Sequence, residues 1–267
     1  NLVHSIPNIV KGNTIKDPFH KENGQLRKFD YIVSNPPFKL DFSDYRDDLD
    51  SKENNERFFA GIPNIKPKSP DKMEIYYLFL QHIIFSLKHN GKAAIVVPTG
   101  FITVQTGIGR KILEYVINNR IIAGVISMPS NIFATTGTNV SILFLDNKNN
   151  EDIILIDASN LGTEIKEGKN KKTILSIDDE EKIYSAFQNK EKIKDFSVVV
   201  KIDQIIKNKY SLRASQYFDI EIIYEEISES EFSRKINKYN KSLEGLFHQN
   251  TELEKKIIKN LKSINYD

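Results

Sequence analysis

Short runs of apolar residues, separated by polar segments, recur along the first 160 residues of the chain. Each run is mostly apolar, often β-branched, and bounded by Gly, Pro, Asn or Asp, which is typical of a buried strand. Two stretches between them, 74–88 and 110–118, place apolar residues on one face of a helix. The predicted strands are FDYIV (29–33), KAAIVVP (92–98), IIAGVISMP (121–129), VSILFLD (140–146) and DIILIDA (152–158).

The alternation of strands and helices predicts parallel strand–helix–strand units. Continuous apolar strands, rather than alternating ones, suit a sheet that is covered on both faces. We therefore predict an α/β fold with a mostly parallel sheet, helices on both faces and a C-terminal helical tail. Three predicted strands run into proline-containing loops at their carboxyl ends, which is the edge of such a sheet where ligands bind.

Polar stretches divide the rest of the chain. Residues 39–72 are rich in Asp, Lys, Ser and Pro and form one long excursion, a feature that is usually functional or disordered. Residues 160–172 are predicted to form a surface hairpin or a domain boundary, and 173–222 a small mixed segment. The predicted organisation is a catalytic domain over 1–160, a small α/β extension over 161–222 and a long helix over 223–267.

Apolar residues in the tail, from Glu226 onwards, recur in steps of three and four. This spacing is the seam of a long helix that packs on other helices, and the two asparagines on it are interpreted as register markers. A helix that folds back onto its own domain is the alternative. The sustained repeat favours a partner helix. The seam residues are Ile236, Tyr239, Leu243, Leu246, Asn250, Leu253, Ile257, Asn260 and Ile264.

The composition excludes some classes of protein. The chain has 38 Lys and Arg against 36 Asp and Glu, a net charge of +2, which is too balanced to predict a nucleic-acid binder from charge alone. It has no cysteine, so thiolate metal sites and disulfides are excluded and a cytoplasmic location is expected. No apolar run approaches the roughly 20 residues of a membrane helix, and no membrane association is expected. The five histidines are scattered without a second ligand at metal-binding spacing.

The stretch Asn35-Pro36-Pro37-Phe38 follows the first predicted strand directly. Two successive prolines form a stiff turn that cannot continue a sheet, because each fixes φ and lacks an N–H donor. The Asn35 amide and the Pro36 carbonyl can then point outwards with Phe38 beside them. Two oxygen acceptors and an aromatic face suit a flat ring that carries an amino group, with stacking worth about 1–3 kcal/mol. The alternative interpretation is a rigid strand-ending turn with an incidental phenylalanine.

The sequence NPPF after a hydrophobic strand resembles the catalytic motif of S-adenosylmethionine-dependent amino-group methyltransferases, especially adenine-N6 DNA methyltransferases. Further segments, in order, are similar to the modification subunit of type I restriction-modification systems over about residues 1–220. The resemblance implies a Rossmann-like methyltransferase fold. The segments are RFFAGIPN (57–64), YYLFLQHIIFSLKHNGKAAIVVPTGF (76–101), VISMPSNIFATTGTNVSILFLDNK (125–148), ILIDAS (154–159) and YSLRASQYF (210–218).

The resemblance implies a role for each residue of the motif. Asn35 and the Pro36 carbonyl, on the corner that Pro37 completes, would orient the N6 amino group of a target adenine, and Phe38 would stack on the base. Phe133 matches the family's second aromatic residue and would hold the base from the other side. The base must leave the helix, because a methyl donor cannot reach it within the stack. The implied cofactor is S-adenosyl-L-methionine, with no metal.

The same resemblance implies the partners. They are double-stranded DNA, a specificity subunit that docks on the C-terminal helix, and a second modification subunit and a restriction subunit of the complex. Sequence specificity supplied by a partner agrees with the low net charge of this chain. Two alternatives stay open: a methyltransferase for protein glutamine or an RNA amino group, and a non-catalytic assembly fragment.

The chain also departs from the family pattern. The family's glycine-rich cofactor turn and its ribose-binding acidic residue lie upstream of NPPF and have no counterpart here. The stretch NIVKGNTI (8–15) resembles the next motif, but Asn13 stands where the family commonly has an Asp that binds the cofactor adenine; Asp17 is the alternative candidate. The chain begins with Asn1. We therefore expect a C-terminal part of a subunit, or a chain completed by another, that binds cofactor poorly alone.

Overall fold

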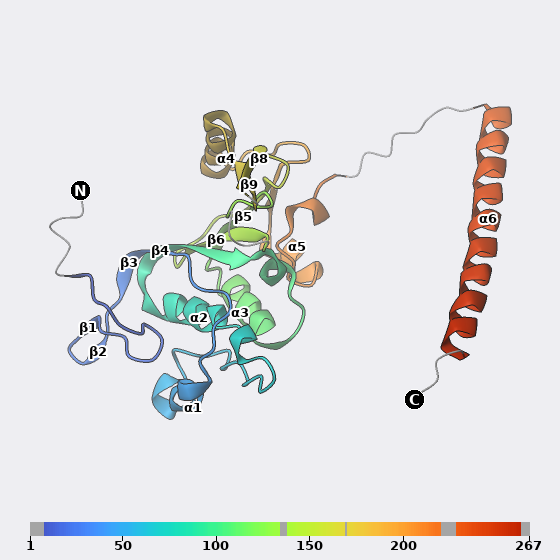
Figure 1. Cartoon of the computed structure of the whole chain (residues 1–267). Helices are drawn as coiled ribbons and strands as arrows, with labels where there is room; N and C mark the ends of the chain where they lie inside the picture. Colours follow the sequence, from blue (N-terminus) through green and yellow to red (C-terminus); the bar gives the residue numbers. More distant parts are fainter. Residues whose placement is uncertain (1–7, 134–137, 169, 220–227, 263–267) are drawn as a thin grey trace. The chain divides into compact units, whose positions relative to one another are not determined.

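The structure is a computed structural model that describes residues 8–133, 138–168, 170–219 and 228–262. The chain divides into two compact units, Asn1–Asp219 and Ile220–Asp267 (Figure 1). The first unit is built on a six-stranded sheet, and the second contains the long helix α6, Glu229–Lys262. Among the described residues, no helix has the length and apolar character needed to cross a membrane.

A mixed sheet forms the centre of the first unit. Its strands are β3 (Phe29–Ser34), β4 (Leu87–Pro98), β5 (Ile122–Ser127), β6 (Val140–Asp146), β7 (Ile153–Asp157) and β10 (Ser197–Val200). They lie in the order β10-β7-β5-β6-β4-β3. Parallel pairs join β3 to β4 and β5 to β7, while β6 pairs antiparallel with β4 and β5, and β10 with β7. Thus β3, β4, β5 and β7 run in one direction, which confirms the predicted mostly parallel sheet.

Helices cover the sheet from two sides (Figure 1). Helices α2 (Tyr76–Ser86) and α3 (Gly107–Asn118) connect β3 to β4 and β4 to β5, and their apolar residues form one core with these strands. Helix α4 (Ile177–Asn189) packs on the other face of the sheet. There Ala186 forms a separate hydrophobic cluster with Ile154 and Ile156 of β7. The short helix α5 (Ile202–Lys207) follows β10. The predicted parallel strand–helix–strand units are therefore confirmed for β3-α2-β4 and β4-α3-β5.

The junction of α2 and β4 differs from the expected one. The helix predicted over 74–88 ends at Ser86, and β4 begins at Leu87 rather than at 92. The pairing of β3 with β4 shifts register just after Phe29. Gly91 lies at this irregularity, where a Cβ atom would come within 2.8 Å of the Phe29 carbonyl oxygen. A glycine here lets the two strands approach, so this polar HNG stretch belongs to the strand and not to a loop.

The excursion over 39–72 has a core of its own. The N–H of Leu40 donates to the carbonyl of Met73 at 3.1 Å, which closes the excursion at its base. Phe42 and Phe58 are buried in a cluster with Met73 and Ile15. The segment contains α1 (Arg46–Leu49) and several 3-10 turns instead of longer elements. Its burial of aromatic residues makes it a folded subregion of the first unit.

Two hairpins lie outside the central sheet. The polar stretch over 160–172 forms β8 (Thr163–Glu167) and β9 (Asn170–Ile174), the hairpin alternative of the prediction. A smaller hairpin pairs β1 (Lys21–Glu22) with β2 (Gln25–Leu26). The described part of the 161–222 segment also supplies β10 and α4 to the central sheet and its second face. The functional division into 1–160, 161–222 and 223–267 stays a prediction.

One end of the sheet is not covered. Strand β3 is an edge strand, and Tyr31 and Val33 on it are 77% and 86% exposed. Beside them an apolar hollow of about 240 Å³ is lined by Ala94 and Phe144, among others. The expectation that both faces are covered is therefore correct for β5 and β7 and wrong for β3 within the described residues.

Helix α6 is described by itself. Ser228 caps its first turn, because its hydroxyl accepts from the N–H of Glu231 at 3.3 Å. Lys259 and Lys262 lie in its last turn, where a positive charge interacts well with the helix dipole. No residue of α6 is buried within the described structure. The seam residues from Ile236 to Asn260 lie on this helix, and Ile264 is outside the described residues.

Candidate functional site

The diproline corner follows β3 at the carboxyl-end edge of the sheet. Asn35 is exposed, Pro36 is buried and Pro37 is exposed. The buried proline anchors the corner, and the asparagine side chain beside it is free to meet a ligand. The exposure of Asn35 is consistent with the predicted outward direction of its amide.

Phe38 lies half-buried just beyond this corner. Its ring and that of Tyr76 form a T-shaped contact, with ring centroids 6.2 Å apart and planes at 72°, which helps to hold the ring in place. Burial, together with the neighbouring Tyr77, raises the pKa of Tyr76 well above its ordinary value, and its hydroxyl stays neutral. A partly exposed ring that is held by an aromatic neighbour keeps its position and can still contact a planar ligand.

Phe133 lies in the loop between β5 and β6 and is 37% exposed. Strands β3 and β5 run in the same direction, so Phe38 and Phe133 both follow the carboxyl ends of strands and lie at the same edge of the sheet. The loop is fastened where Thr173 on β9 bonds to Ser130 and Asn131. Residues 134–137 of the IFATTG stretch are outside the described residues.

The turn from Asn13 to Asp17 holds the two candidate cofactor residues. The Asn13 side-chain oxygen accepts from the N–H groups of Ile15 and Lys16, each at 3.0 Å. An amide oxygen has two lone pairs, so both are engaged within the turn. The N–H of Asp17 donates to the carbonyl of Asn13 at 2.8 Å. Within the described residues, the exposed carboxylate of Asp17 has no such engagement, so Asp17 is the candidate of the two that keeps an acceptor available.

Arg57 clamps this turn from the long excursion, which the sequence analysis did not recognise. Arg57 is 4% exposed. Its guanidinium donates to the carbonyls of Thr14 and Ile15 at 2.8 and 2.9 Å. Its Nε donates to Nδ1 of His82 at 3.0 Å. Burial lowers the pKa of Arg57 to about 10, so the side chain stays charged at neutral pH. The RFF stretch after an acidic run carried no local signal for this role.

His82 is the partner that this arginine requires. Burial, and then the nearby charges of Arg57 and Lys28, lower the pKa of His82 to about 3. The neutral ring accepts at Nδ1 and carries its proton on Nε2. Its contact with Arg57 gives His82 a structural role. Within the described residues, no group of three His, Asp or Glu side chains is placed to hold a metal ion.

The family model described as N-6 DNA Methylase matches residues 2–226, more than half of the chain. The chain belongs to the N-6 DNA methylase family. The matched range includes the NPPF corner, the Asn13–Asp17 turn and the Phe133 loop. The family that the sequence motifs resembled is thus confirmed.

Several curated relatives of this chain are named as methylase subunits of type I restriction enzymes. The MjaIX methylase subunit of Methanocaldococcus jannaschii is 27% identical over 262 residues, covering 94% of this chain and 45% of the relative. The MpnII methylase subunit of Mycoplasma pneumoniae is 30% identical over 250 residues, covering 92% and 41%. The chain therefore spans about half the length of these curated relatives.

A solved structure supports the fold. The methyltransferase subunit of a type I restriction-modification system from Streptococcus thermophilus superimposes with a TM-score of 0.63 and 26% identity. The match covers 78% of this chain and 41% of that one. The α/β architecture of an N-6 DNA methylase is therefore confirmed for the first unit.

Proposed function

We propose that this chain is the catalytic part of an adenine-N6 DNA methyltransferase subunit of a type I restriction-modification complex. The observation that carries the proposal is the exposed Asn35 on a corner anchored by the buried Pro36, beside the half-exposed Phe38. These groups lie at the sheet edge where α/β enzymes bind ligands. Membership of the N-6 DNA methylase family supports the choice of an adenine amino group as the acceptor.

The proposed chemistry is positioning for an in-line transfer. The Asn35 amide oxygen and the Pro36 carbonyl oxygen each accept a hydrogen bond from one N–H of the N6 amino group. These bonds draw the nitrogen lone pair out of conjugation with the ring. Phe38 and Phe133 hold the extruded base between two rings, each worth about 1–3 kcal/mol of stacking. Bound S-adenosyl-L-methionine supplies the methyl group. The protein residues orient and desolvate the amino group, and no covalent enzyme intermediate is required.

Cofactor binding is proposed to need more than the described residues. Asp17 fits an adenine amino group, but Asn13 is engaged in its own turn. The free edge of β3 and the exposed Tyr31 and Val33 offer a surface on which further strands and a helix can pack. We infer that the rest of the subunit, or a second chain, covers this surface and completes the cofactor site.

The partner that fits α6 is a pair of long helices on a specificity subunit. Its seam residues are exposed from Ile236 to Asn260 on this 34-residue helix and are bordered by charged positions. Deleting Ser228 to Asp267 should leave the first unit folded but prevent assembly with that subunit. Gel filtration that returns an intact complex would refute this role for the tail.

The test of the catalytic role is the variant Asn35→Ala in the assembled complex. Methyl transfer to duplex DNA should fall by at least about a hundredfold, since a group that acts on the transition state is lost. Filter-binding affinity for the same DNA should stay within about twofold, because the residue contacts only the extruded amino group. Asn90→Ala, on the exposed amino-end half of β4, is the matched control and should transfer methyl at the wild-type rate.

The cofactor proposal and the alternative substrates are tested separately. Calorimetry with S-adenosyl-L-methionine should give no heat with this chain alone and micromolar binding with the assembled complex. Transfer of labelled methyl groups should be measured on duplex DNA, RNA and a glutamine-containing peptide in parallel. Label that enters only RNA or peptide would replace the DNA assignment, and retained turnover in Asn35→Ala would remove the catalytic role.

A further inference from the structure

A polar pocket lies at the same edge of the sheet as the NPPF corner. Its volume is about 340 Å³, and residues that follow β4, β5 and β7 line it. Since neighbouring strands lie about 4.8 Å apart, the pocket spans from about 5 to 20 Å across the sheet from β3. This is the distance of a few base pairs along a DNA strand from the proposed target base. Lining residues that bear polar side chains include Thr99, Thr103, Ser127, Ser130, Asn139 and Arg213.

Arg213 is the basic residue of this pocket. Within the described residues, its exposed guanidinium has no hydrogen-bond or ion-pair partner. Its neighbours Leu212 and Ala214 are buried, at 0% and 2% exposure. The N–H of Leu212 donates to the carbonyl of Ile102 at 2.9 Å. The backbone of this segment is therefore fixed while its cation faces the pocket.

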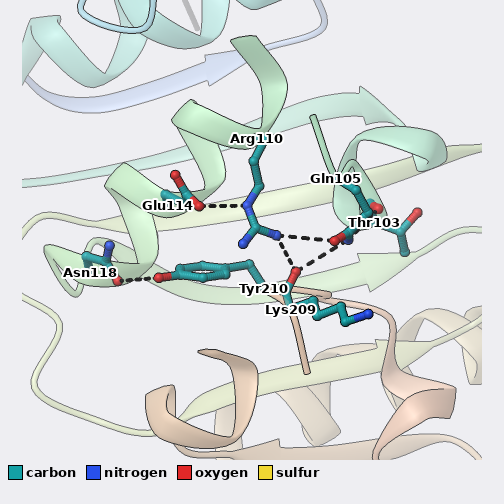
Figure 2. A network of polar contacts seen from close by, with 7 residues as sticks. All are labelled: Thr103, Gln105, Arg110, Glu114, Asn118, Lys209 and Tyr210. Atoms are coloured by element: carbon teal, nitrogen blue, oxygen red, sulfur yellow. Dashed lines mark hydrogen bonds and ion pairs between the residues drawn. The ribbon is translucent and has the colours of Figure 1, made fainter. Parts of the chain in front are cut away.

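A network of polar contacts fastens the same segment to the Thr103 loop (Figure 2). Arg110 at the start of α3 donates to the carbonyl of Lys209, and Gln105 donates to the carbonyls of Lys209 and Thr103 at 3.3 and 3.0 Å. Tyr210 stacks under the Arg110 guanidinium at 4.2 Å. The carboxylate of Glu114 accepts from Arg110 Nε at 2.8 Å, which balances the charge.

This network uses Arg110 for structure and leaves Arg213 free. Lys209 and Tyr210 both have positive φ values, 55° and 62°. Residues other than glycine rarely adopt this backbone conformation. The sharp turn that they form directs the chain back over the Thr103 loop. The result is a rigid arm that presents the Arg213 guanidinium to the pocket, beside several hydroxyl groups.

We propose that this pocket binds a backbone phosphate of the DNA strand that carries the target adenine, with Arg213 donating to the phosphate oxygens. The proposal rests on the proposed function. Guanidinium groups match phosphate oxygens in a bidentate manner, and serine and threonine hydroxyls are common additional donors. A phosphate held here fixes the register of the strand while the adenine occupies the NPPF corner. The chain has a net charge of only +2, so a single placed cation carries more of the binding than it does on a basic protein.

Asp157 at the carboxyl end of β7 makes the pocket testable. Its carboxylate lines the pocket, and one of its oxygens accepts from the N–H of Ser159 at 3.1 Å. A phosphate in the pocket meets one attractive and one repulsive charge. Removing the two charges separately must therefore change DNA affinity in opposite directions.

The experiment measures DNA affinity of the assembled complex between 50 and about 250 mM salt, a range in which counterion release is resolved. Arg213→Gln should bind about tenfold more weakly at the middle of this range, and the slope of log K against log salt should fall in magnitude by about 1. Arg213→Lys should restore most of the slope. Asp157→Asn should bind more tightly than wild type. Lys148→Gln, the same charge change at the opposite edge of the sheet, should change neither quantity.

Each outcome decides the proposal. Unchanged affinity and slope in Arg213→Gln, or weaker binding in Asp157→Asn, would overturn it. The proposed function is tested independently, since the Asn35→Ala complex retains both charges of the pocket. A complex that methylates DNA through Asn35 but ignores the Arg213 charge keeps its function and loses only the phosphate site. A wild-type complex that methylates no DNA would instead refute the proposed function.

Discussion

The hydroxyl of Thr173 donates a 2.6 Å hydrogen bond to the carbonyl oxygen of Ser130. Its N–H donates to the carbonyl of Asn131 at 3.0 Å, so one residue of β9 makes two bonds to the loop after β5. Thr173 is 8% exposed, which leaves little room for water to replace it. The described part of the loop after β5, which carries Phe133, is therefore positioned by a hairpin outside the central sheet.

We expect Thr173→Val to slow methylation about five- to tenfold, because one bond of roughly 1 kcal/mol that holds the Phe133 loop is lost. Cofactor affinity should stay unchanged, since the turn that carries Asp17 belongs to another part of the chain. Single-turnover methylation of adenine-containing duplex DNA, at several concentrations of S-adenosyl-L-methionine, measures both the rate and the cofactor affinity. Thr173→Ser keeps the hydroxyl and should recover the rate. An equal loss in Thr163→Val, on the exposed face of β8, would contradict the positioning role.

Arg57 leads to a second prediction, about cofactor affinity. Arg57→Lys cannot reach both carbonyls and His82 together, so the turn that carries Asp17 loses its clamp. The KM for S-adenosyl-L-methionine in the complete enzyme should rise at least about tenfold, while the KM for DNA changes little. Arg46→Lys, on the same excursion but bonded to Asp47 and Asp50, is the control and should leave both constants unchanged. A uniform loss of activity with unchanged KM values would assign Arg57 to stability alone.

His82 links the same clamp to pH. Its pKa is about 3 in the folded chain and near 6.5 when unfolded, so between these values the unfolded state binds more protons. The stabilising effect of the neutral ring is complete above pH 6.5 and decreases by up to about 1.4 kcal/mol per unit as pH falls towards 3. Denaturant unfolding of the chain at several pH values measures this slope. His82→Gln keeps an acceptor for Arg57 and does not titrate. The free energy of unfolding of this variant should therefore depend less on pH between about 3 and 6.5. The same slope in the variant and the wild type would exclude His82 as the cause.

The strands and the functional corner were predictable because their signals are local. The predicted strand over 140–146 coincides with β6, and FDYIV differs from β3 by one residue. Apolar runs that end at proline or glycine mark such strands in any context. The turn after β3 was likewise predictable, since the diproline within NPPF excludes continuation of a helix or a strand.

The strand order and the clamps were not predictable, because they depend on contacts between distant residues. No local signal indicates that β6 is inserted antiparallel between β4 and β5, because the apolar pattern of a buried strand does not depend on its direction. Arg57 contacts Thr14 from 43 residues away, and its sequence neighbourhood suggests an exposed charge. The bonds of Thr173 likewise join segments that no periodicity connects. Such residues are recognised only when the fold brings their partners together.

Two adjacent residues of α6, Gly245 and Leu246, test the assembly role of the tail in opposite ways. A Cβ atom at Gly245 would meet no atom within 4 Å, so Gly245→Ala should stabilise the helix by about 1 kcal/mol and leave or improve association with the specificity subunit. Leu246 lies on the predicted seam, and Leu246→Asp buries a charge in the interface and should prevent association. Circular dichroism measures helix content and sedimentation velocity measures assembly. His248→Asp, on the opposite face of the helix, should assemble normally; equal assembly of Leu246→Asp and His248→Asp would place the partner surface elsewhere.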